Sequence, residues 1–298
     1  MNTPILIITF NRPHFLKKIV SVLKKIKPKK IYFKIDGPRQ GNKNDEKQIL
    51  KTKKIINKIQ WKCKKIVFES KKNLGSRDNP TRGIDWLFSH EKRGIILEDD
   101  CIPNKSFFKY CEELLKKYEN NNKISMISGR NNLERTDLRS SYYFTFGNTW
   151  GWATWRDVWK IYDKDIKFWP RFKNSLGWKK NFLTIDERRY WSLVFDACYQ
   201  NKIDSWAYPW TLSLWKKELL TVTPSKNLVN NIGLTSTRTY FKLSSPSYKT
   251  GYLNVEKIKF NNNLKIDKKA DSFIFINNFK GKIKTNIWKI LRFFNYGV

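Results

Sequence analysis

The chain has 298 residues, of which 40% are hydrophobic and 15% aromatic, so it can bury a large core and is not a disordered basic tail. Sixty Lys and Arg side chains stand against 26 Asp and Glu, and the net charge of +34 predicts attraction to polyanions. Nucleic-acid binding is nevertheless disfavoured, because lysine is abundant along the whole chain and no helix-turn-helix, zinc-finger, RNP or KH signature occurs.

The chain opens with alternating strand and helix patterns. A strand over Ile5–Phe10 leads into Asn11-Arg12-Pro13 and then into a helix with apolar residues at a spacing near 3.6. A second strand, Ile31–Ile35, ends at Asp36-Gly37-Pro38-Arg39, and a lysine-rich helix is expected from about Asp45 to Ile59. No apolar run approaches the roughly 18 residues of a membrane span, and the first strand lacks a basic leader, so we expect a cytoplasmic protein.

The same alternation continues to residue 103. A third strand, Lys65–Glu69, runs into Asn73-Leu74-Gly75-Ser76-Arg77, and a helix around Arg82–His90 leads to a short apolar strand, Ile95–Leu97. This order predicts a doubly wound, mostly parallel α/β sheet flanked by helices. The chain contains neither a G-x-G-x-x-G nor a P-loop motif, which disfavours a dinucleotide site or a P-loop nucleotidase.

Three consecutive acids, Glu98-Asp99-Asp100, follow the fourth strand. Open α/β sheets bind ligands outside the carboxyl ends of their strands, where adjacent carboxylates repel each other unless a cation or hydrogen bonds compensate. Carboxylate oxygens suit Mg²⁺ or Mn²⁺, which complete their coordination with substrate phosphates. A solvated turn or a helix cap is the alternative interpretation. A zinc site is not expected, because the four cysteines lack C-x-x-C spacing and only two histidines occur.

The second half of the chain is rich in aromatic residues. After a helix over Phe107–Tyr118 and a strand over Ile124–Ile127, the segment Tyr142–Trp159 contains eight Phe, Tyr and Trp residues. We interpret most of them as the core of an acceptor lobe, although aromatic rings also stack on sugars. Trp150, between Gly147 and Gly151, is the better candidate for a loop lining a site.

Several motifs, in one order along the chain, resemble the bacterial nucleotide-diphospho-sugar transferases of the GT-A fold, some of which have been labelled hemolytic proteins. The resemblance covers about Pro4 to Thr239, and the motifs are TFNRP, IDGPR, NLG, GIILEDDCIP, FFKYCEELL, SMISG, WGWATWRDVW and NLVNNIG. It implies an aromatic-rich acceptor lobe beside a Rossmann-like half, and a divalent metal, Mn²⁺ or Mg²⁺, held on a diphosphate by the last acid, Asp100.

The resemblance also implies further contacts with the nucleotide sugar. The nucleoside would be held by the ends of the first two strands, and Arg39 and Arg77 would contact phosphate, for which a guanidinium is geometrically suited. Glu98 and Asp99 would contact ribose or metal-bound water. The full set of expected nucleotide-sugar contacts is Thr9, Asn11, Arg12, Asp36, Arg39, Asn73, Arg77, Glu98, Asp99, Trp150 and Arg238.

An inverting transferase needs a carboxylate base that deprotonates the acceptor hydroxyl. The candidates are Asp204 and the pair Asp186 and Glu187, although acids in a first helical turn are also ordinary caps. Two positions depart from the pattern of the family. Ala207 stands where an acid is common, and Arg238 stands where relatives carry a histidine, so that it can neutralise phosphate charge but cannot ligate a cation.

The last segment is expected to differ from the rest. We divide the chain into a nucleotide-sugar-binding half (1–130), an acceptor or catalytic half of the same GT-A domain (131–243) and a C-terminal appendage (244–298). Residues 280–294 form a basic amphipathic helix pattern, which suits an anionic membrane surface on the inner face of the cell membrane or docking on protein.

Together these features predict a metal-dependent, inverting glycosyltransferase. Its donor would be a nucleoside diphosphate sugar, UDP-linked, carrying GlcNAc or another hexose or N-acetylhexosamine. Its acceptor would be a glycan or a lipid-linked acceptor in the biosynthesis of surface polysaccharide such as lipopolysaccharide. The alternative is a non-catalytic protein on the same fold that binds sugar nucleotides or polyanions.

Overall fold

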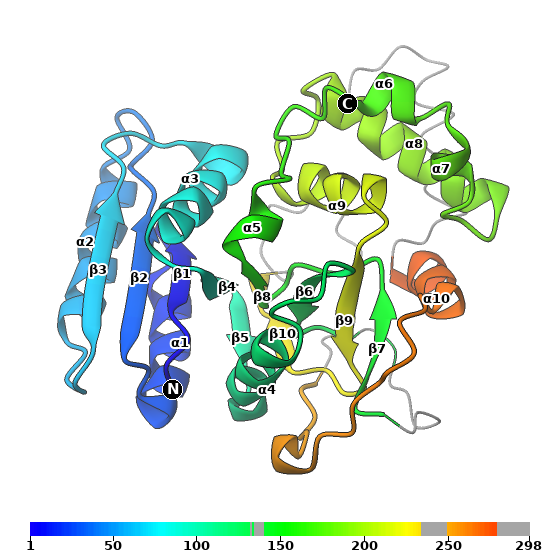
Figure 1. The fold of residues 1–298 in the computed structure, drawn as a ribbon. Coiled ribbons are helices and arrows are strands. Elements are labelled where there is room, and N and C mark those ends of the chain that lie inside the picture. The colour runs from blue at the N-terminus through cyan, green and yellow to red at the C-terminus, as the bar shows by residue number, and fades with distance from the viewer. Residues whose placement is uncertain (132, 134–139, 234–248, 279–298) are drawn as a thin grey trace.

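The computed structural model describes residues 1–131, 133, 140–233 and 249–278. An eight-stranded sheet runs through the molecule in the order β3-β2-β1-β4-β8-β6-β9-β7 (Figure 1). Its strands are β1 (Ile5–Thr9), β2 (Lys30–Ile35), β3 (Lys64–Glu69), β4 (Arg93–Glu98), β6 (Ile124–Ser128), β7 (Tyr142–Thr145), β8 (Trp152–Trp155) and β9 (Leu220–Pro224). A second sheet pairs β5 (Cys101–Pro103) with β10 (Val229–Asn231).

Six of the eight strands are parallel. Strands β3, β2, β1 and β4 form a continuous parallel block, and β8 then pairs antiparallel with both β4 and β6. Beyond it, β6 is parallel to β9, and β7 closes the sheet antiparallel to β9. The fold is therefore an α/β fold with a mixed, mostly parallel sheet, as the alternating sequence pattern predicted.

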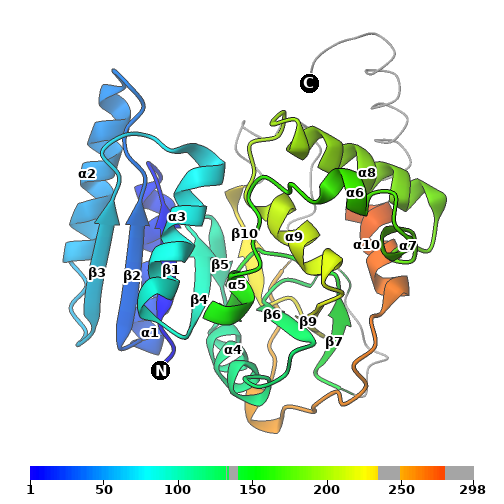
Figure 2. The same cartoon turned by 45° about the horizontal axis from the view of Figure 1, so that its top comes forward.

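Helices cover both faces of the sheet, as Figures 1 and 2 show from two directions. The helices are α1 (Pro13–Ile26), α2 (Lys43–Asn57), α3 (Gly75–His90), α4 (Lys105–Lys117), α5 (Arg156–Trp159), α6 (Trp169–Phe172), α7 (Leu176–Lys179), α8 (Ile185–Tyr199), α9 (Ala207–Lys216) and α10 (Lys268–Asn278), with a 3₁₀ turn at Val255–Lys257.

Strand side chains alternate between the two faces and build two cores. In β1, Ile5 and Ile7 pack with α1, α2 and α4, whereas Leu6 and Ile8 face α3 and an aromatic layer of α5 to α9. The apolar runs of β1 and β4 are buried on both faces, which explains why these two strands have no polar alternation. The core interpretation of the Tyr142–Trp159 aromatics is confirmed for most of them, and Trp150 stays half-buried.

The elements expected up to Ser128 are present, with one shifted boundary. Helix α3 begins at Gly75, seven residues before the expected start at Arg82. Its first turns contain Asn79 and Pro80, which are poor helix formers, and the helix start is stabilised from outside, by a carboxylate at the end of β2. A tertiary contact therefore sets this boundary.

The segment 249–278 lies along the second half of the sheet. Helix α10 packs beside β7, and Phe275 is buried in the aromatic core, while Leu253 and Val255 join the core on the opposite face. Within the described residues, no helix combines the length and the apolar character needed to cross a membrane. The expected amphipathic helix at 280–294 and the expected phosphate contact Arg238 both lie outside the described residues.

Candidate functional site

The parallel block brings polar side chains to one edge of the sheet. Strand β1 is hydrogen-bonded between β2 and β4, with Thr9 opposite Ile35 and Ile8 opposite Glu98. The carboxyl ends of these three strands therefore meet, and Asp36 and the acids Glu98, Asp99 and Asp100 lie at the same edge. We call Glu98, Asp99 and Asp100 the acidic triplet.

Asp99 is the buried centre of this triplet. Its Oδ2 accepts a hydrogen bond of 3.0 Å from the Thr9 hydroxyl and one of 3.4 Å from the backbone N–H of Phe10. Arg12, in the loop after β1, forms ion pairs with both Asp99 and Asp100, and its Nη1 lies 3.1 Å from Asp100 Oδ2. Thr9, Arg12 and the triplet therefore form one connected group, although they come from two strands.

The triplet carries more negative charge than its surroundings compensate. Burial, Asp100 and Asp99 together raise the pKa of Glu98 to about 8, although Arg12 and a hydrogen bond from the Trp206 indole oppose the rise. Burial raises the pKa of Asp99 to about 6, against the opposing effect of Arg12. Among the described residues, Arg12 is the one guanidinium that pairs with this group of three carboxylates, so an additional cation at this position would lower the electrostatic free energy.

A glycine-containing segment crosses over Asp100. Strand β10 pairs antiparallel with β5, which follows the triplet directly, and the N–H of Ile232 donates to the Asp100 carbonyl at 2.9 Å. Gly233 then lies so close that a Cβ there would collide with the Asp100 carboxylate. The NLVNNIG and EDDCIP motifs are thus in contact, and Gly233 is needed for this close approach.

The donor atoms of the triplet fit a hard divalent cation. Asp100 is half-buried and offers carboxylate oxygens, and its second oxygen lies 3.6 Å from the Cys101 thiol. Among the residues that the structure describes, no three His, Cys, Asp or Glu side chains are grouped so as to hold a metal by themselves. The protein would therefore supply one or two carboxylates, as is common for Mg²⁺ on a diphosphate, and the ligand would supply the other oxygens.

Asp36 caps helix α3 across the edge. Its two oxygens accept hydrogen bonds from the N–H groups of Leu74 and Gly75, at 2.8 and 3.1 Å, and from the Asn73 amide at 3.0 Å. Burial still raises the pKa of Asp36, which these hydrogen bonds lower. Asp36 and Asn73, both expected to contact the nucleotide, are thus brought together, and they fix the start of α3 beside the triplet.

Asn11 and Arg39 converge on an acid that the sequence did not single out, Asp45. The Asn11 amide donates to Asp45 at 2.6 Å, and Arg39 binds the same carboxylate in a bidentate manner at 2.6 and 2.8 Å. The backbone N–H of Asp45 in turn donates to the Asn42 side chain, which caps α2. In this arrangement Arg39 points to Asp45, and its expected contact with phosphate stays a prediction.

The three candidate bases occupy different places. Asp204 lies at the edge, where the Ser76 hydroxyl donates to its carboxylate at 2.8 Å, and two residues later Trp206 reaches Glu98. Nearby, Arg77 Nη1 donates to the Asn201 side chain at 2.7 Å. The other two candidates begin helix α8. Glu187 forms a capping box with Thr184, and this end of α8 faces α10 (Figures 1 and 2).

The Trp150 loop lies next to the triplet. Gly147 and Gly151 both have positive φ, and a Cβ at Gly151 would contact Leu97, the residue before Glu98. The Trp150 ring is covered by the Arg130 guanidinium, whose central carbon lies 3.3 Å from the ring centre. Trp150 is therefore brought to the edge, with one face of its ring already occupied by a cation.

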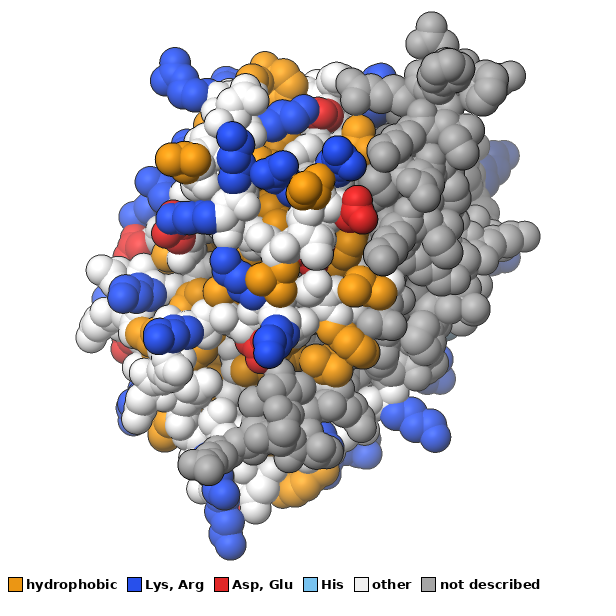
Figure 3. Space-filling view, turned by 90° about the vertical axis from the view of Figure 1, so that its right-hand side faces the viewer, with side chains coloured by type: hydrophobic (Ala, Val, Ile, Leu, Met, Phe, Trp, Pro, Cys, Tyr) orange, Lys and Arg blue, Asp and Glu red, His pale blue; other side chains and the backbone are white. Residues whose placement is uncertain are grey.

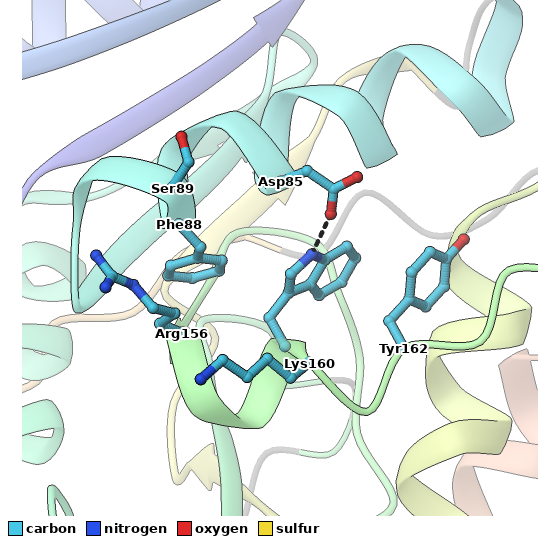
Figure 4. Close-up of a pocket in the computed structure, with 7 residues that line it drawn as sticks. Asp85, Phe88, Ser89, Arg156, Lys160 and Tyr162 are labelled. Atoms are coloured by element: carbon cyan, nitrogen blue, oxygen red, sulfur yellow. Dashed lines mark hydrogen bonds between the residues drawn. The ribbon is translucent and has the colours of Figure 1, made fainter.

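A pocket of about 300 Å³ lies elsewhere, between α3 and α5 (Figure 4). Arg156 and Lys160 line one side, and Asp85 accepts a hydrogen bond of 2.7 Å from the Trp159 indole. The rest of the lining is Phe88, Ser89 and Tyr162. None of the residues expected at the site lines this pocket, so we place the candidate site at the sheet edge on its chemistry.

Sequence reasoning missed four residues of the edge: Asp45, Ser76, Trp206 and Gly233. Trp206 could not be predicted as a site residue, because the second half of the chain is rich in aromatic residues and its sequence context does not distinguish it from the other tryptophans. In the structure its indole forms a hydrogen bond with Glu98. Gly233 is the last residue of the NLVNNIG motif, for which the sequence analysis gave no role. A partial signal existed for Asp45, since Asn42-x-x-Asp45 is a helix-start pattern that places an acid in the first turn.

Comparison with known proteins adds little to this picture. No model of a known protein family matches the chain, and no curated protein matches it in sequence. Among solved structures, UDP-glucose pyrophosphorylase complexed with UDP-glucose matches over 78% of this chain and 94% of its own, with 10% identity and a TM-score of 0.41.

Two transferases match less well. Galactosyltransferase LgtC in complex with donor and acceptor sugar analogs covers 58% of this chain and 66% of its own, with 9% identity and a TM-score of 0.34. Mouse xyloside xylosyltransferase 1 covers 74% and 84%, with 11% identity and a TM-score of 0.32. At these TM-scores we draw no functional conclusion from the likeness, and any functional assignment depends on the residues of this chain.

Proposed function

We propose that the protein is a metal-dependent glycosyltransferase that moves a sugar from a nucleoside diphosphate, UDP in our expectation, to a glycan or a lipid-linked acceptor. The observation that supports this most is the acidic triplet at the carboxyl edge of the parallel block, where Arg12 is the one ion-pair partner among the described residues. A diphosphate with a divalent cation matches this edge in charge and in ligand chemistry.

In this proposal each group at the edge has a distinct task. Asp100, with Asp99 behind it, would hold Mn²⁺ or Mg²⁺, which when bound stabilises the charge of the departing nucleoside diphosphate. Arg12 holds Asp99 and Asp100 in place and adds a positive charge beside the phosphates. Asp36 and Asn73 fix the start of α3 beside the triplet, because Asp36 accepts hydrogen bonds from the first N–H groups of the helix and from the Asn73 amide.

Asp204 is the base that the geometry favours. It lies at the same edge as the triplet, whereas Asp186 and Glu187 start a helix that faces α10. As base, Asp204 would take the proton of the acceptor hydroxyl while the sugar leaves its diphosphate, with inversion at the anomeric carbon. The exposed side chain of Asp204 can be reached by an acceptor from solvent. A GlcNAc or other hexose donor, and an acceptor in surface polysaccharide, remain our expectation.

The test is a release assay with a panel of UDP-sugars and Mn²⁺, in the full chain and in Asp100→Asn. The proposal predicts metal-dependent release of UDP from at least one sugar, and loss of that release in the variant. Trp150→Ala serves as a second probe, because the proposal places Trp150 beside the donor without making it a metal ligand.

A non-catalytic sugar-nucleotide binder is the second candidate, and the observation behind it is Ala207, which removes the acid that relatives commonly carry. That candidate predicts metal-dependent binding of UDP-sugars in the same protein without UDP release for any sugar of the panel.

A further inference from the structure

A second surface of the molecule combines exposed apolar side chains with lysines. Five large apolar residues project from α7, from the start of α8 and from α10: Leu176, Leu183, Ile185, Phe273 and Ile276. Leu176 is the most exposed of them, at 81%. Figure 3 views the side of the molecule where α7 and α10 lie, and shows hydrophobic side chains interspersed with many Lys and Arg and few acids.

These residues belong to one continuous part of the surface. The Lys268 ammonium at the start of α10 donates to the carbonyl of Lys180, directly after α7, at 2.6 Å. Behind them, Tyr190 of α8 packs against Phe275 of α10, with ring centres 5.3 Å apart. The exposed ends of α7, α8 and α10 are therefore held together. We call these five residues, with their neighbouring basic side chains, the α7–α10 surface.

The charged side chains of this surface are mostly basic. Lys179, Arg189 and Lys269 are exposed, and Lys180 is paired with the exposed Glu218 at 2.6 Å, whereas the nearby acids Glu187 and Asp271 are turned inward, to the α8 cap and to the Phe146 N–H. Lysine is depleted in protein–protein interfaces, where Arg and aromatic residues are enriched. Single aliphatic side chains among lysines instead suit a bilayer surface, where apolar groups reach the acyl boundary and ammonium groups stay at the headgroups.

We propose that the α7–α10 surface docks on an anionic lipid bilayer. Each lysine near such a surface adds electrostatic attraction to the anionic headgroups, and the net charge of +34 adds a long-range component. The apolar side chains then set the depth of contact, because their burial in the acyl boundary removes them from water. The site at the sheet edge takes no part in this binding, so the proposal stands or falls separately from glycosyl transfer.

The experiment is vesicle flotation of the full chain with a matched pair of double variants. Leu183→Glu with Ile185→Glu changes two residues of the surface. Leu50→Glu with Val67→Glu changes two apolar residues on α2 and β3 by the same charge. The pairs are similarly exposed, since Leu183 is 53% and Leu50 56% exposed. A glutamate at residue 185 also suits the first turn of α8, so the fold should be retained, which circular dichroism checks.

With vesicles of phosphatidylcholine mixed with phosphatidylglycerol, we expect the Leu183/Ile185 variant to partition at least about tenfold more weakly than the unmodified chain. The Leu50/Val67 variant should stay within about twofold, and none of the three should float with phosphatidylcholine alone. Equal losses in the two variants would overturn the proposal, because they would reflect net charge only. So would a dimer that the Leu183/Ile185 variant dissociates in analytical ultracentrifugation, since a second copy would then cover the surface.

Discussion

Asp45 and the acidic triplet lie at the same sheet edge, but they differ in how far neighbouring donors compensate their negative charge. Asp45 is fully enclosed by donors from Asn11, Arg39 and the backbone of Arg39, and the hydrogen bonds from Arg39 lower its pKa to about 2. In the acidic triplet, burial and mutual repulsion raise the pKa of Glu98 to about 8. Among the described residues, the charge of Asp45 is fully compensated by its partners, whereas the charge of the triplet is not.

This difference separates a structural acid from a candidate ligand site. A carboxylate whose partners all come from the chain stabilises the fold, and its replacement should affect stability first. Carboxylates that repel one another destabilise the fold until a cation binds, and such arrangements concentrate at functional sites. Experiments in which activity and stability are measured on the same variants test this difference.

The largest expected effect is that of Asp100→Asn on turnover. Loss of the proposed metal ligand should lower UDP release by about two to three orders of magnitude, since a metal contributes several kcal/mol of charge stabilisation. Stability should stay equal or rise, because one of three mutually repelling charges is removed. A variant that unfolds more easily than the parent would place Asp100 with the structural acids. The melting temperature and the release assay are measured in the same buffer.

The next effect concerns the base. Asp204→Asn should lower transfer to acceptor by about a hundredfold or more, which is the range of a general base, while donor binding persists. The matched control is Asp186→Asn, which removes the same charge at the start of α8 and should leave transfer within about twofold. If the control variant loses the activity and Asp204→Asn retains it, the base lies at α8 and our placement is wrong.

A smaller effect is expected on stability from Asp45→Asn. The variant should lose about 2 kcal/mol of unfolding free energy, because the amide cannot accept the bidentate Arg39 contact and the Asn11 bond together. The folded variant should still bind UDP with Mn²⁺, within a few fold of the parent. Urea denaturation gives the free energy, and calorimetric titration gives the affinity. A stable variant that no longer binds would make Asp45 part of the ligand site.

The pH dependence of stability provides the smallest effect. The folded pKa of Asp45, about 2, lies below its ordinary value of 3.8, so its contribution is present above about pH 4 and is lost as the pH falls towards 2. Since Arg39 is 41% exposed and screened by water, we expect about 1 kcal/mol in this window. Urea denaturation at pH 2 to 5 should show the loss in the parent chain and a flatter profile in Asp45→Asn. Identical profiles would contradict the assignment.

The two halves of the fold differ in how well the sequence predicts their strands. Buried parallel strands appear as unbroken apolar runs, so Ile5–Thr9 was predicted to within one residue, and the centre of Arg93–Glu98 was predicted as Ile95–Leu97. The antiparallel strand β8 (Trp152–Trp155) was not predicted, because its place between β4 and β6 depends on pairing with segments far away in the chain.

For the site, too, contacts between segments far apart in the chain could not be predicted from the sequence. Residues at or directly after the end of a strand, such as Thr9, Asp36 and Asp99, were predictable at the edge, since parallel strands bring their carboxyl ends together. The partners of these residues were not, because Trp206 on Glu98 and Ser76 on Asp204 join segments more than 100 residues apart. The roles of the site residues stay predictions until ligands are bound.

The central claim is that the acidic triplet binds a diphosphate through a divalent cation. The most direct measurement is calorimetric titration of UDP into the full chain, with Mn²⁺ and with EDTA, and into Asp100→Asn with Mn²⁺. We predict binding that requires Mn²⁺ and that weakens at least about tenfold in the variant, whose fold is unchanged. Equal affinity for UDP with EDTA, or undiminished affinity in Asp100→Asn, would contradict it.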